Sequence, residues 1–254
     1  MMSGRKVMEK TTIAVTMAGL GQRFVDSGYE QPKYELDVRG KTLFEWACQS
    51  LGSWFERGSQ AIFVVRAGVG AEDFVTGKLG KVGLDACAIV ELDGPTDGQA
   101  TSALMAGREV ADPTAPFLVY NIDTHVRQGV LQCDDVVGDG WIPVFEGQGN
   151  AWSFVAPAGS DSDDNDRVAQ VWEKVRVSDL ATIGLYWFRS YEIYAATYQR
   201  HFSSDENSLG ERYVAPLYNT MIQDGQDVRF RLLPSSSVVP LGTPTELKSF
   251  ELGA

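Results

Sequence analysis

Short apolar runs alternate with helically spaced apolar residues through the first half of the chain. Residues 42–55 and 99–110 place apolar side chains at spacings of three and four, which predicts helices that pack on a sheet. Strands alternating with such helices predict right-handed β-α-β units and a mainly parallel sheet. Ligands of such sheets bind beyond the carboxyl ends of the strands. The predicted strands are residues 13–17, 61–66, 86–92 and 117–122.

The second half is less regular and indicates a mixed or antiparallel insert. Helices are predicted over residues 191–202 and 209–224, and a short terminal helix begins at the capping box of residues 243–246. The acidic run 161–166 fails the spacing of a calcium loop, because Asp166 stands where glycine is required, and is predicted to be a solvated hairpin tip. The remaining predicted strands are residues 141–146, 152–157, 168–173, 182–188 and 228–233.

Composition narrows the class of protein. The 254 residues carry 22 Lys and Arg against 34 Asp and Glu, a formal net charge of −12. Nucleic acid and anionic membranes both require a basic surface, so neither is expected as a partner. We expect a cytoplasmic protein, because residues 1–10 hold no signal-peptide core and no apolar run approaches the ~20 residues of a membrane span. Three scattered cysteines, Cys48, Cys87 and Cys133, are expected to be buried, reduced thiols.

A glycine loop follows the first predicted strand. Residues 18–24 read Ala-Gly-Leu-Gly-Gln-Arg-Phe, and a Pro-Lys pair ending at Lys33 lies downstream. Glycines let the backbone turn and approach a ligand closely, so that loop N–H groups can surround phosphate oxygens. Arg23 adds a planar fork of donors and Lys33 a compact point charge. Together these parts predict a triphosphate site.

Two commoner phosphate motifs do not fit the loop. The dinucleotide fingerprint needs glycine where Phe24 stands, and the Walker loop needs glycine where Glu35 stands. The remaining pattern, G-x-G-x-R-F with a downstream Pro-Lys, resembles the signature loop of the nucleoside-diphosphate-sugar pyrophosphorylases, a nucleotidyltransferase family. The alternative is a surface turn with an unrelated Arg and Lys. The resemblance implies that Arg23 and Lys33 are catalytic and that nucleotide is bound by Met17, Ala18, Gly19, Leu20 and Gly21.

Asp123 closes the fourth predicted strand and faces the same mouth as the glycine loop. A strand-end carboxylate there can hold Mg²⁺ on the triphosphate, since Mg²⁺ takes one or two carboxylates plus phosphate oxygens. The resemblance gives Asp123 this role, and a helix cap is the alternative. An Asp-x-His pair with His125 would suit a GT-A glycosyltransferase, but we favour a loop histidine.

Residues 94–101 follow the third predicted strand and open a helix. The resemblance assigns Gly98 and Gln99 to the nucleobase, with the glycine allowing the base to lie flat on the backbone. A plain turn with a helix cap at Asp97 or Thr101 is the alternative. A pyrimidine base is slightly favoured over a purine.

The acceptor half contains further matches to the same family. The resemblance implies that Glu173 accepts hydrogen bonds from acceptor hydroxyls, that Lys174 pairs with the acceptor phosphate and that Asn219 also binds the acceptor. An exposed Glu-Lys pair on an edge strand is the alternative. The resemblance covers nearly the whole chain and is greatest to the small cytoplasmic nucleotidyltransferases of capsule and surface-polysaccharide biosynthesis. It rests on PKYELDVRGKTLFEWA, NIDT, EKVRVSDLATIGLYWF and YVAPLYNTMI.

Two departures from the family pattern matter. Tyr34-Glu35 stands where many relatives have Pro-Leu. Leu241 precedes the C-terminal Gly-Thr where the family usually has a second metal-binding Asp. The predicted metal site therefore rests on Asp123 and phosphate oxygens.

We predict a single GT-A-like, Rossmann-type α/β domain over residues 1–254, with a nucleotide-binding half at 1–125 and an acceptor-binding half at 126–254. The expected activity joins an NTP to a sugar 1-phosphate, with Mg²⁺ as cofactor and pyrophosphate as product. Three alternatives stay open: a cytidylyltransferase for a non-sugar phosphate (phosphocholine, a phosphonate or a phosphorylated amino acid), a GT-A glycosyltransferase, and an inactive subunit that senses nucleotide. A homodimer is also left open.

Overall fold

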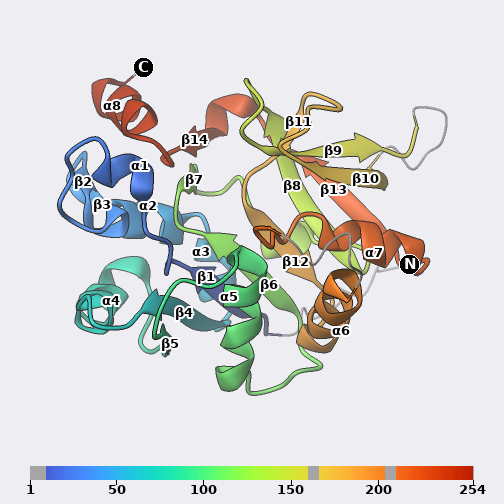
Figure 1. Cartoon of the computed structure of the whole chain (residues 1–254), viewed down its shortest axis with the longest axis horizontal. Helices are drawn as coiled ribbons and strands as arrows, with labels where there is room; N and C mark the ends of the chain where they lie inside the picture. Colours follow the sequence, from blue (N-terminus) through green and yellow to red (C-terminus); the bar gives the residue numbers. More distant parts are fainter. Residues whose placement is uncertain (1–9, 160–165, 204–209, 254) are drawn as a thin grey trace, which may run out of the picture.

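The computed structural model describes residues 10–159, 166–203 and 210–253. A ten-stranded mixed sheet runs through the middle in the order β10-β9-β11-β8-β12-β6-β1-β4-β5, with β13 paired to β8 (Figure 1). This confirms the predicted α/β class. The strands are β1 (Thr12–Thr16), β4 (Gln60–Arg66), β5 (Ala88–Leu92), β6 (Phe117–Asn121), β8 (Gly140–Glu146), β9 (Ser153–Pro157), β10 (Val168–Glu173), β11 (Leu180–Thr182), β12 (Leu185–Phe188) and β13 (Val228–Leu232).

The two ends of the sheet differ in strand direction. Strands β6, β1, β4 and β5 pair in parallel, as the alternation of strands and helices predicts. Strand β12 pairs antiparallel with both β6 and β8 and so joins this part to the later strands. In the register of β1 and β6, Thr16 lies opposite Asn121. The loops that leave β1 and β6 therefore start side by side at one edge of the sheet.

Helices cover both faces of the sheet (Figure 1). One face packs against helices from the first half of the chain, and the other against α5 and two helices from the second half. Alternate residues of β1 supply the two layers: Ile13 and Val15 face one cluster, while Ala14 faces the other. The first group is α2 (Leu43–Gln49), α3 (Gly52–Phe55) and α4 (Ala71–Val82); the second is α5 (Gln99–Met105), α6 (Tyr191–Phe202) and α7 (Leu217–Gln223).

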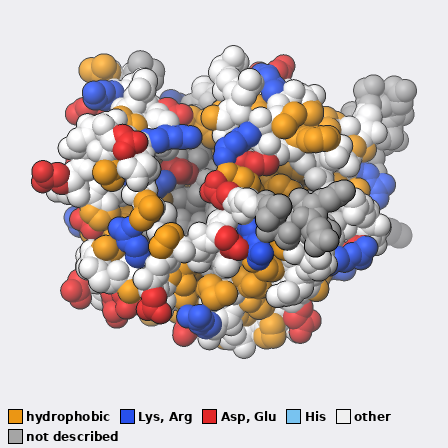
Figure 2. All heavy atoms as spheres, viewed as in Figure 1, with side chains coloured by type: hydrophobic (Ala, Val, Ile, Leu, Met, Phe, Trp, Pro, Cys, Tyr) orange, Lys and Arg blue, Asp and Glu red, His pale blue; other side chains and the backbone are white. Residues whose placement is uncertain are grey.

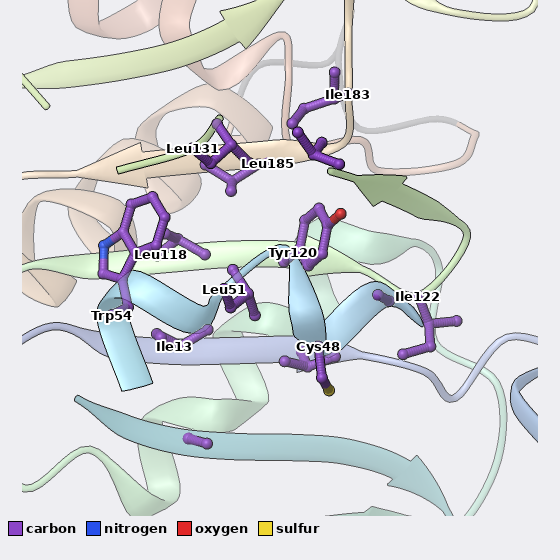
Figure 3. Packing of buried hydrophobic residues seen from close by; sticks show 14 of the residues in the cluster. Ile13, Cys48, Leu51, Trp54, Leu118, Tyr120, Ile122, Leu131, Ile183 and Leu185 are labelled. Atoms are coloured by element: carbon purple, nitrogen blue, oxygen red, sulfur yellow. The ribbon is translucent and has the colours of Figure 1, made fainter. Parts of the chain in front are cut away.

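The core beneath α2 and α3 fixes the position of β1 and β6. Leu51 and Trp54 lie against Ile13 and Leu118 of these strands, and all four side chains are fully or almost fully buried (Figure 3). Burying a large apolar side chain contributes roughly 1.5–3 kcal/mol relative to leaving it in water. The loops beyond these two strands are therefore carried on a rigid base.

A third, smaller cluster joins the glycine loop to the C-terminus. Phe24 of the short helix α1 (Gln22–Val25) packs with Leu241 and with Leu247 of α8 (Pro244–Leu252). Two short ribbons complete this region: β2 (Asp37–Val38) with β3 (Lys41–Thr42), and β7 (Thr124–Val126) with β14 (Val238–Pro240). Neither ribbon was predicted, because two- and three-residue strands carry no periodic signal. Four 3₁₀ turns fall in the described residues: Lys33–Glu35, Ala106–Glu109, Cys133–Asp135 and Ser235–Ser237.

Several predicted helices are corrected by the structure. The predicted helix 42–55 is two helices, α2 and α3, interrupted at Ser50-Leu51. It does begin at a capping box, in which Thr42 accepts from the Glu45 amide at 3.3 Å and the Glu45 carboxylate accepts from the Thr42 amide at 2.9 Å. The predicted helix 209–224 begins only at Leu217, and its first residue lies outside the described residues. Helix α4 was missed.

One predicted strand is also corrected. Residues 182–188 form the end of β11 and all of β12, because the chain turns at Gly184. Gly184 has a φ of +76°, and a Cβ there would come within 2.1 Å of the Asn121 side chain, so only glycine fits. The acidic run 161–166 lies outside the described residues except for Asp166, which pairs with Arg229 at 2.8 Å.

The three cysteines are free thiols, as predicted. Cys48 and Cys133 are buried, whereas Cys87 is only partly buried. Burial raises the pKa of the Cys48 thiol well above its usual range, which makes it unreactive. Within the described part of the chain, no helix is long and apolar enough to cross a membrane.

Candidate active site

A cavity of about 590 Å³ opens at the carboxyl ends of β1 and β6. It is the hollow near the middle of the face in Figure 2, rimmed by charged side chains. Twelve of the predicted site residues line it, from both halves of the chain. They are Met17, Ala18, Gly19, Leu20, Gly21, Arg23, Lys33, Gly98, Gln99, Asp123, Glu173 and Lys174.

The glycine loop is held by the residues at its end. Gly21 has a φ of +63° and leads into α1. A Cβ placed on Gly21 would lie 3.7 Å from the Cβ of Lys33, so the loop packs against the aliphatic part of this lysine. Phe24 is 1% exposed and anchors α1 in the small C-terminal cluster. Arg23 lies between them, is exposed, and makes no ion pair with any described residue. Its guanidinium is therefore available to a ligand.

Lys33 and Asp123 form an ion pair across the mouth of the cavity. The Lys33 Nζ lies 2.9 Å from Asp123 Oδ2, and the two side chains are 18% and 28% exposed. The C-terminal segment packs on the same aspartate: the Leu241 amide donates to the Asp123 carbonyl at 2.8 Å, and a Cβ at Gly242 would lie 3.5 Å from the carboxylate. Asp123 is thus fixed between the glycine loop and the C-terminus. It caps no helix.

The loop before α5 makes its closest contact with a segment from the second half of the chain. Gly98 has a φ of +152°, and a Cβ there would stand 2.3 Å from the carbonyl oxygen of Arg212. The Ala100 amide donates to that carbonyl at 2.9 Å, and the Arg212 amide donates to the Asp97 carbonyl at 2.7 Å. Gln99 donates to Thr16 at 3.1 Å. The glycine is required by this close approach, a reason that the sequence did not reveal.

Glu173 and Lys174 both line the cavity although they are neighbours in sequence. Successive residues of a strand normally point to opposite faces. Lys174 departs from the strand with a φ of +55°, and this turn brings its side chain to the same side as Glu173. Such a conformation is uncommon for a residue other than glycine and tends to occur at functional sites.

The predicted acceptor side of the cavity also contains residues that the sequence did not predict. Ser153 donates a hydrogen bond to the Glu173 carboxylate, and Lys174 donates one to the Tyr213 hydroxyl. Burial raises the pKa of Glu173 above its usual value, despite the opposing hydrogen bond from Ser153. Glu211 lines the cavity beside Tyr213. Both lie just before the YVAPLYNTMI motif or at its start, which was the only sequence signal for them.

Asn219 is the exception among the predicted residues. Its side-chain oxygen accepts from the Val171 amide and its nitrogen donates to the Val171 carbonyl, both at 2.8 Å. The asparagine therefore ties α7 to β10 and is not part of the cavity lining. It is the one predicted site residue that the structure does not bring to the cavity.

Comparisons with known proteins agree with this geometry. No family model and no curated protein matches the chain. Among solved structures, a nucleoside-diphosphate-sugar pyrophosphorylase from Vibrio cholerae RC9 is 34% identical, with a TM-score of 0.87 over 95% of this chain and 100% of that one.

The chain belongs to the nucleoside-diphosphate-sugar pyrophosphorylases and related nucleotidyltransferases. It is accordingly an enzyme.

More distant members share the fold. The inositol-1-phosphate CTP transferase from T. maritima is 15% identical, with a TM-score of 0.73 over 96% of this chain and 94% of that one. The CTP:phosphocholine cytidylyltransferase from Streptococcus pneumoniae is 19% identical, with a TM-score of 0.68 over 96% and 98%. At these identities the likeness concerns the fold alone.

Family membership removes the glycosyltransferase alternative, and the position of His125 is consistent with that. His125 lies on β7, is 5% exposed, and its Nδ1 is 2.8 Å from the Trp46 carbonyl oxygen. It is a buried strand residue rather than the predicted loop histidine, and it does not line the cavity. Burial lowers the pKa of His125, which favours the neutral ring.

The donor groups for a metal ion in this pyrophosphorylase cavity are few. Leu241, where the sequence resemblance leads us to expect a second aspartate, is 0% exposed and packs in the apolar C-terminal cluster. No group of three or more His, Cys, Asp or Glu side chains suited to a metal occurs within the described residues. Asp123 fits a magnesium ion whose other ligands are phosphate oxygens and water. Glu246 is a further carboxylate on the cavity wall.

Proposed function

We propose that this enzyme transfers a nucleotidyl group from a nucleoside triphosphate to a phosphorylated small molecule, with release of pyrophosphate. The observation that carries the proposal is a single cavity with separate cations for two phosphate-bearing substrates. Arg23 and Lys33 lie at the glycine loop, and Lys174 comes from the other half of the chain. A glycosyltransferase would have little use for the first two.

The reaction needs positioning more than proton transfer. An oxygen of the acceptor phosphate attacks the α-phosphorus of the nucleotide, a new P–O bond forms, and the bond to the β-phosphate oxygen breaks as pyrophosphate leaves. The attacking phosphate is already an anion near neutral pH, because its second pKa is ~6. No general base is then required, and the protein contributes orientation and charge stabilisation.

Each named residue has a place in this scheme. The loop amides after β1 and Arg23 hold the β- and γ-phosphates, and Lys33 stabilises the charge that develops on the α-phosphate. Asp123 would hold Mg²⁺, which supplies neutralisation of the phosphate oxygens. In the free enzyme Lys33 is paired to Asp123 at 2.9 Å, so the lysine leaves this pair when it turns to the α-phosphate of the nucleotide.

For each of the two substrates we propose a chemical class rather than a single compound. A sugar 1-phosphate is supported by the name of the Vibrio cholerae relative, and a pyrimidine nucleotide by the cytidylyl enzymes that share the fold. A non-sugar phosphate acceptor remains the second candidate, because one of those enzymes is named for phosphocholine. A role in capsule or surface-polysaccharide biosynthesis in the cytoplasm stays a prediction from the sequence resemblance.

The direct test is a matrix of the four common NTPs against phosphorylated acceptors, with pyrophosphate release as the readout. We expect release only when both substrates and Mg²⁺ are present, and mass spectrometry should find the nucleotidyl acceptor as product. Hydrolysis of NTP without an acceptor, or no release across the matrix, would reject the proposed activity.

A further inference from the structure

The acceptor half of the cavity already binds an ammonium group, namely the protein's own Lys174. Its Nζ lies 4.3 Å from the centre of the Tyr213 ring and donates a hydrogen bond to the Tyr213 hydroxyl. The same Nζ is 3.7 Å from Glu173 Oε1. An aromatic face with nearby carboxylates is the arrangement by which proteins recognise ammonium ions. We call Glu173, Glu211 and Tyr213 the ammonium subsite.

The ammonium subsite carries two negative charges, and Lys174 supplies the positive charge that faces them. Glu173 is only 17% exposed, and Glu211 accepts a hydrogen bond from the Tyr213 hydroxyl. With Lys174 in place, its one positive charge faces two carboxylates. If Lys174 turns to the acceptor phosphate, as the proposed function requires, both carboxylates lose their counter-charge. An unpaired, largely buried carboxylate is costly.

We infer that the acceptor carries a positively charged amine in addition to its phosphate. This inference rests on the proposed function. The phosphate would draw Lys174 away from the ammonium subsite, and the amine of the acceptor would replace the lysine over Tyr213 and beside Glu173. Both charges of the bound acceptor are then compensated. The amine is either quaternary, as on choline, or protonated, as on an amino sugar or an amino acid.

The ammonium subsite is held in place from outside the cavity. Arg212 lies between Glu211 and Tyr213, and its Nε is 3.0 Å from Asp97 Oδ2. Its guanidinium lies over the Phe202 ring at 4.9 Å. Together with the backbone hydrogen bonds to residues 97 and 100, these contacts fix the two cavity residues on either side. The subsite is therefore preformed, which lowers the entropy cost of binding.

Matched acceptors test the inference. Each pair has the same phosphate and differs in the amine: glucosamine 1-phosphate against glucose 1-phosphate, and phosphoethanolamine against 2-hydroxyethyl phosphate. Phosphocholine and O-phosphoserine extend the series to a quaternary amine and to an amino acid. We expect kcat/KM to favour the amine by about tenfold or more within at least one pair, equivalent to ~1.4 kcal/mol. The preferred pair identifies the source of the amine.

Variants of the subsite separate recognition of the amine from general damage. Glu173→Gln and Tyr213→Leu should reduce the preference for the amine within a pair, with the KM for NTP unchanged. Tyr213→Phe retains the ring and should retain most of the preference. Glu192→Gln, which changes a glutamate of α6 that does not line the cavity, is the matched control.

The outcomes are distinguishable from failure of the proposed activity. Pyrophosphate release that is equally fast with the neutral member of every pair would leave the activity intact and overturn the amine inference. The same conclusion follows if the amine is preferred but Glu173→Gln and Tyr213→Leu leave that preference unchanged. No release with any acceptor or NTP would overturn the proposed function, and the inference with it.

Discussion

At the level of single residues, the ion pair between Lys33 and Asp123 joins the lysine predicted to stabilise the α-phosphate to the aspartate predicted to hold Mg²⁺. At 2.9 Å, with both side chains largely shielded, each group fixes the position of the other before substrate binds. Arg23, in contrast, is exposed and has no ion-pair partner among the described residues. We therefore expect substitution of the two cations to affect the free enzyme differently, although we expect both to be needed for turnover.

Arg23→Ala and Lys33→Ala should each lower kcat by about 10²–10³, the usual cost of one oriented charge contact to a transition state. The thermal midpoint of Arg23→Ala should match that of the parent, because the Arg23 side chain makes no ion pair with any residue that the structure describes. Pyrophosphate release and thermal melts measure the two effects. Arg108→Ala, an exposed arginine outside the cavity, is the control. Parent-like turnover in both loop variants would reject this assignment.

Asp123→Asn should shift the Mg²⁺ dependence of turnover to higher concentrations. Leu241 cannot substitute as a ligand, so the loss should be large at low Mg²⁺, while phosphate oxygens allow part of the rate to return at high Mg²⁺. The measurement is a Mg²⁺ titration of parent and variant at saturating substrates. Identical titration curves would show that Asp123 has a structural role and that the metal is held elsewhere.

Lys174 should control the acceptor and leave the nucleotide unaffected. Lys174→Met keeps the aliphatic stem and removes the charge, and we expect the acceptor KM to rise about tenfold, or ~1.4 kcal/mol. Lys174→Asn checks the backbone, because asparagine tolerates the φ of +55° found here. Each substrate is titrated separately against both variants. An increase confined to the KM for NTP would place the lysine in the nucleotide half and reverse our orientation of the cavity.

Residues of the site were predictable where they follow strand ends. The glycine loop and Asp123 could be placed because the parallel strands that precede them end at one edge of the sheet. Tyr213 and Glu211 could not, because they come from an irregular segment whose position depends on contacts with the loop before α5. The position of Asn219 outside the cavity could not be predicted either, since a motif match carries no information on whether a side chain points into the cavity or ties a helix to a strand.

At the level of elements, the irregular segment before α7 and the loop before α5 act as one unit. Two backbone hydrogen bonds join them at residues 97, 100 and 212, and Gly98 allows the chains to touch. One of these segments carries the predicted base-binding residues, and the other carries Glu211 and Tyr213 of the ammonium subsite. We therefore expect the binding of nucleotide and the binding of acceptor to be coupled through this contact.

Gly98→Ala should disrupt this contact. The new Cβ would stand 2.3 Å from the Arg212 carbonyl, and alanine disfavours the φ of +152°, so we expect a loss of about 1–3 kcal/mol of stability. The KM values for both substrates should also rise. Gly94→Ala, in the same loop but with open space around its Cβ position, is the matched control. Equal effects of the two substitutions would show that the close approach of Gly98 to Arg212 does not affect function.

The elements were predictable to the degree that their residues repeat a pattern. The buried strands β1, β4 and β6 were correctly predicted from continuous apolar runs. The ends of the observed strands differ from the predicted ends by one residue at most. Helix α4 was missed because Gly77 and Gly80 weaken its pattern and few of its residues are buried. The break at Gly184 depends on the distant side chain of Asn121, which no local pattern can report.

For the whole molecule, both histidines lie in packed regions outside the cavity. His125 packs under Trp46, and His201 on α6 has its Nδ1 2.8 Å from the Thr220 hydroxyl. Burial is the first cause that lowers the pKa of each ring. The folded protein therefore favours the neutral form of both, while the unfolded chain protonates them near the ordinary value of ~6.5.

This difference predicts that stability falls as the solution is acidified through pH 6.5. Below that value the unfolded state binds protons that the folded state resists, so each histidine lowers the free energy of unfolding until its own folded pKa is reached. Glu35 and Glu173 have raised pKa values and act in the opposite direction. The expected result is a lower thermal midpoint at pH 5.5 than at pH 7.5.

The double variant His125→Gln, His201→Gln should show a smaller change over the same interval, whatever its midpoint at pH 7.5. A parent midpoint that does not change, or a double variant with the full pH dependence, would show that the histidines are not responsible.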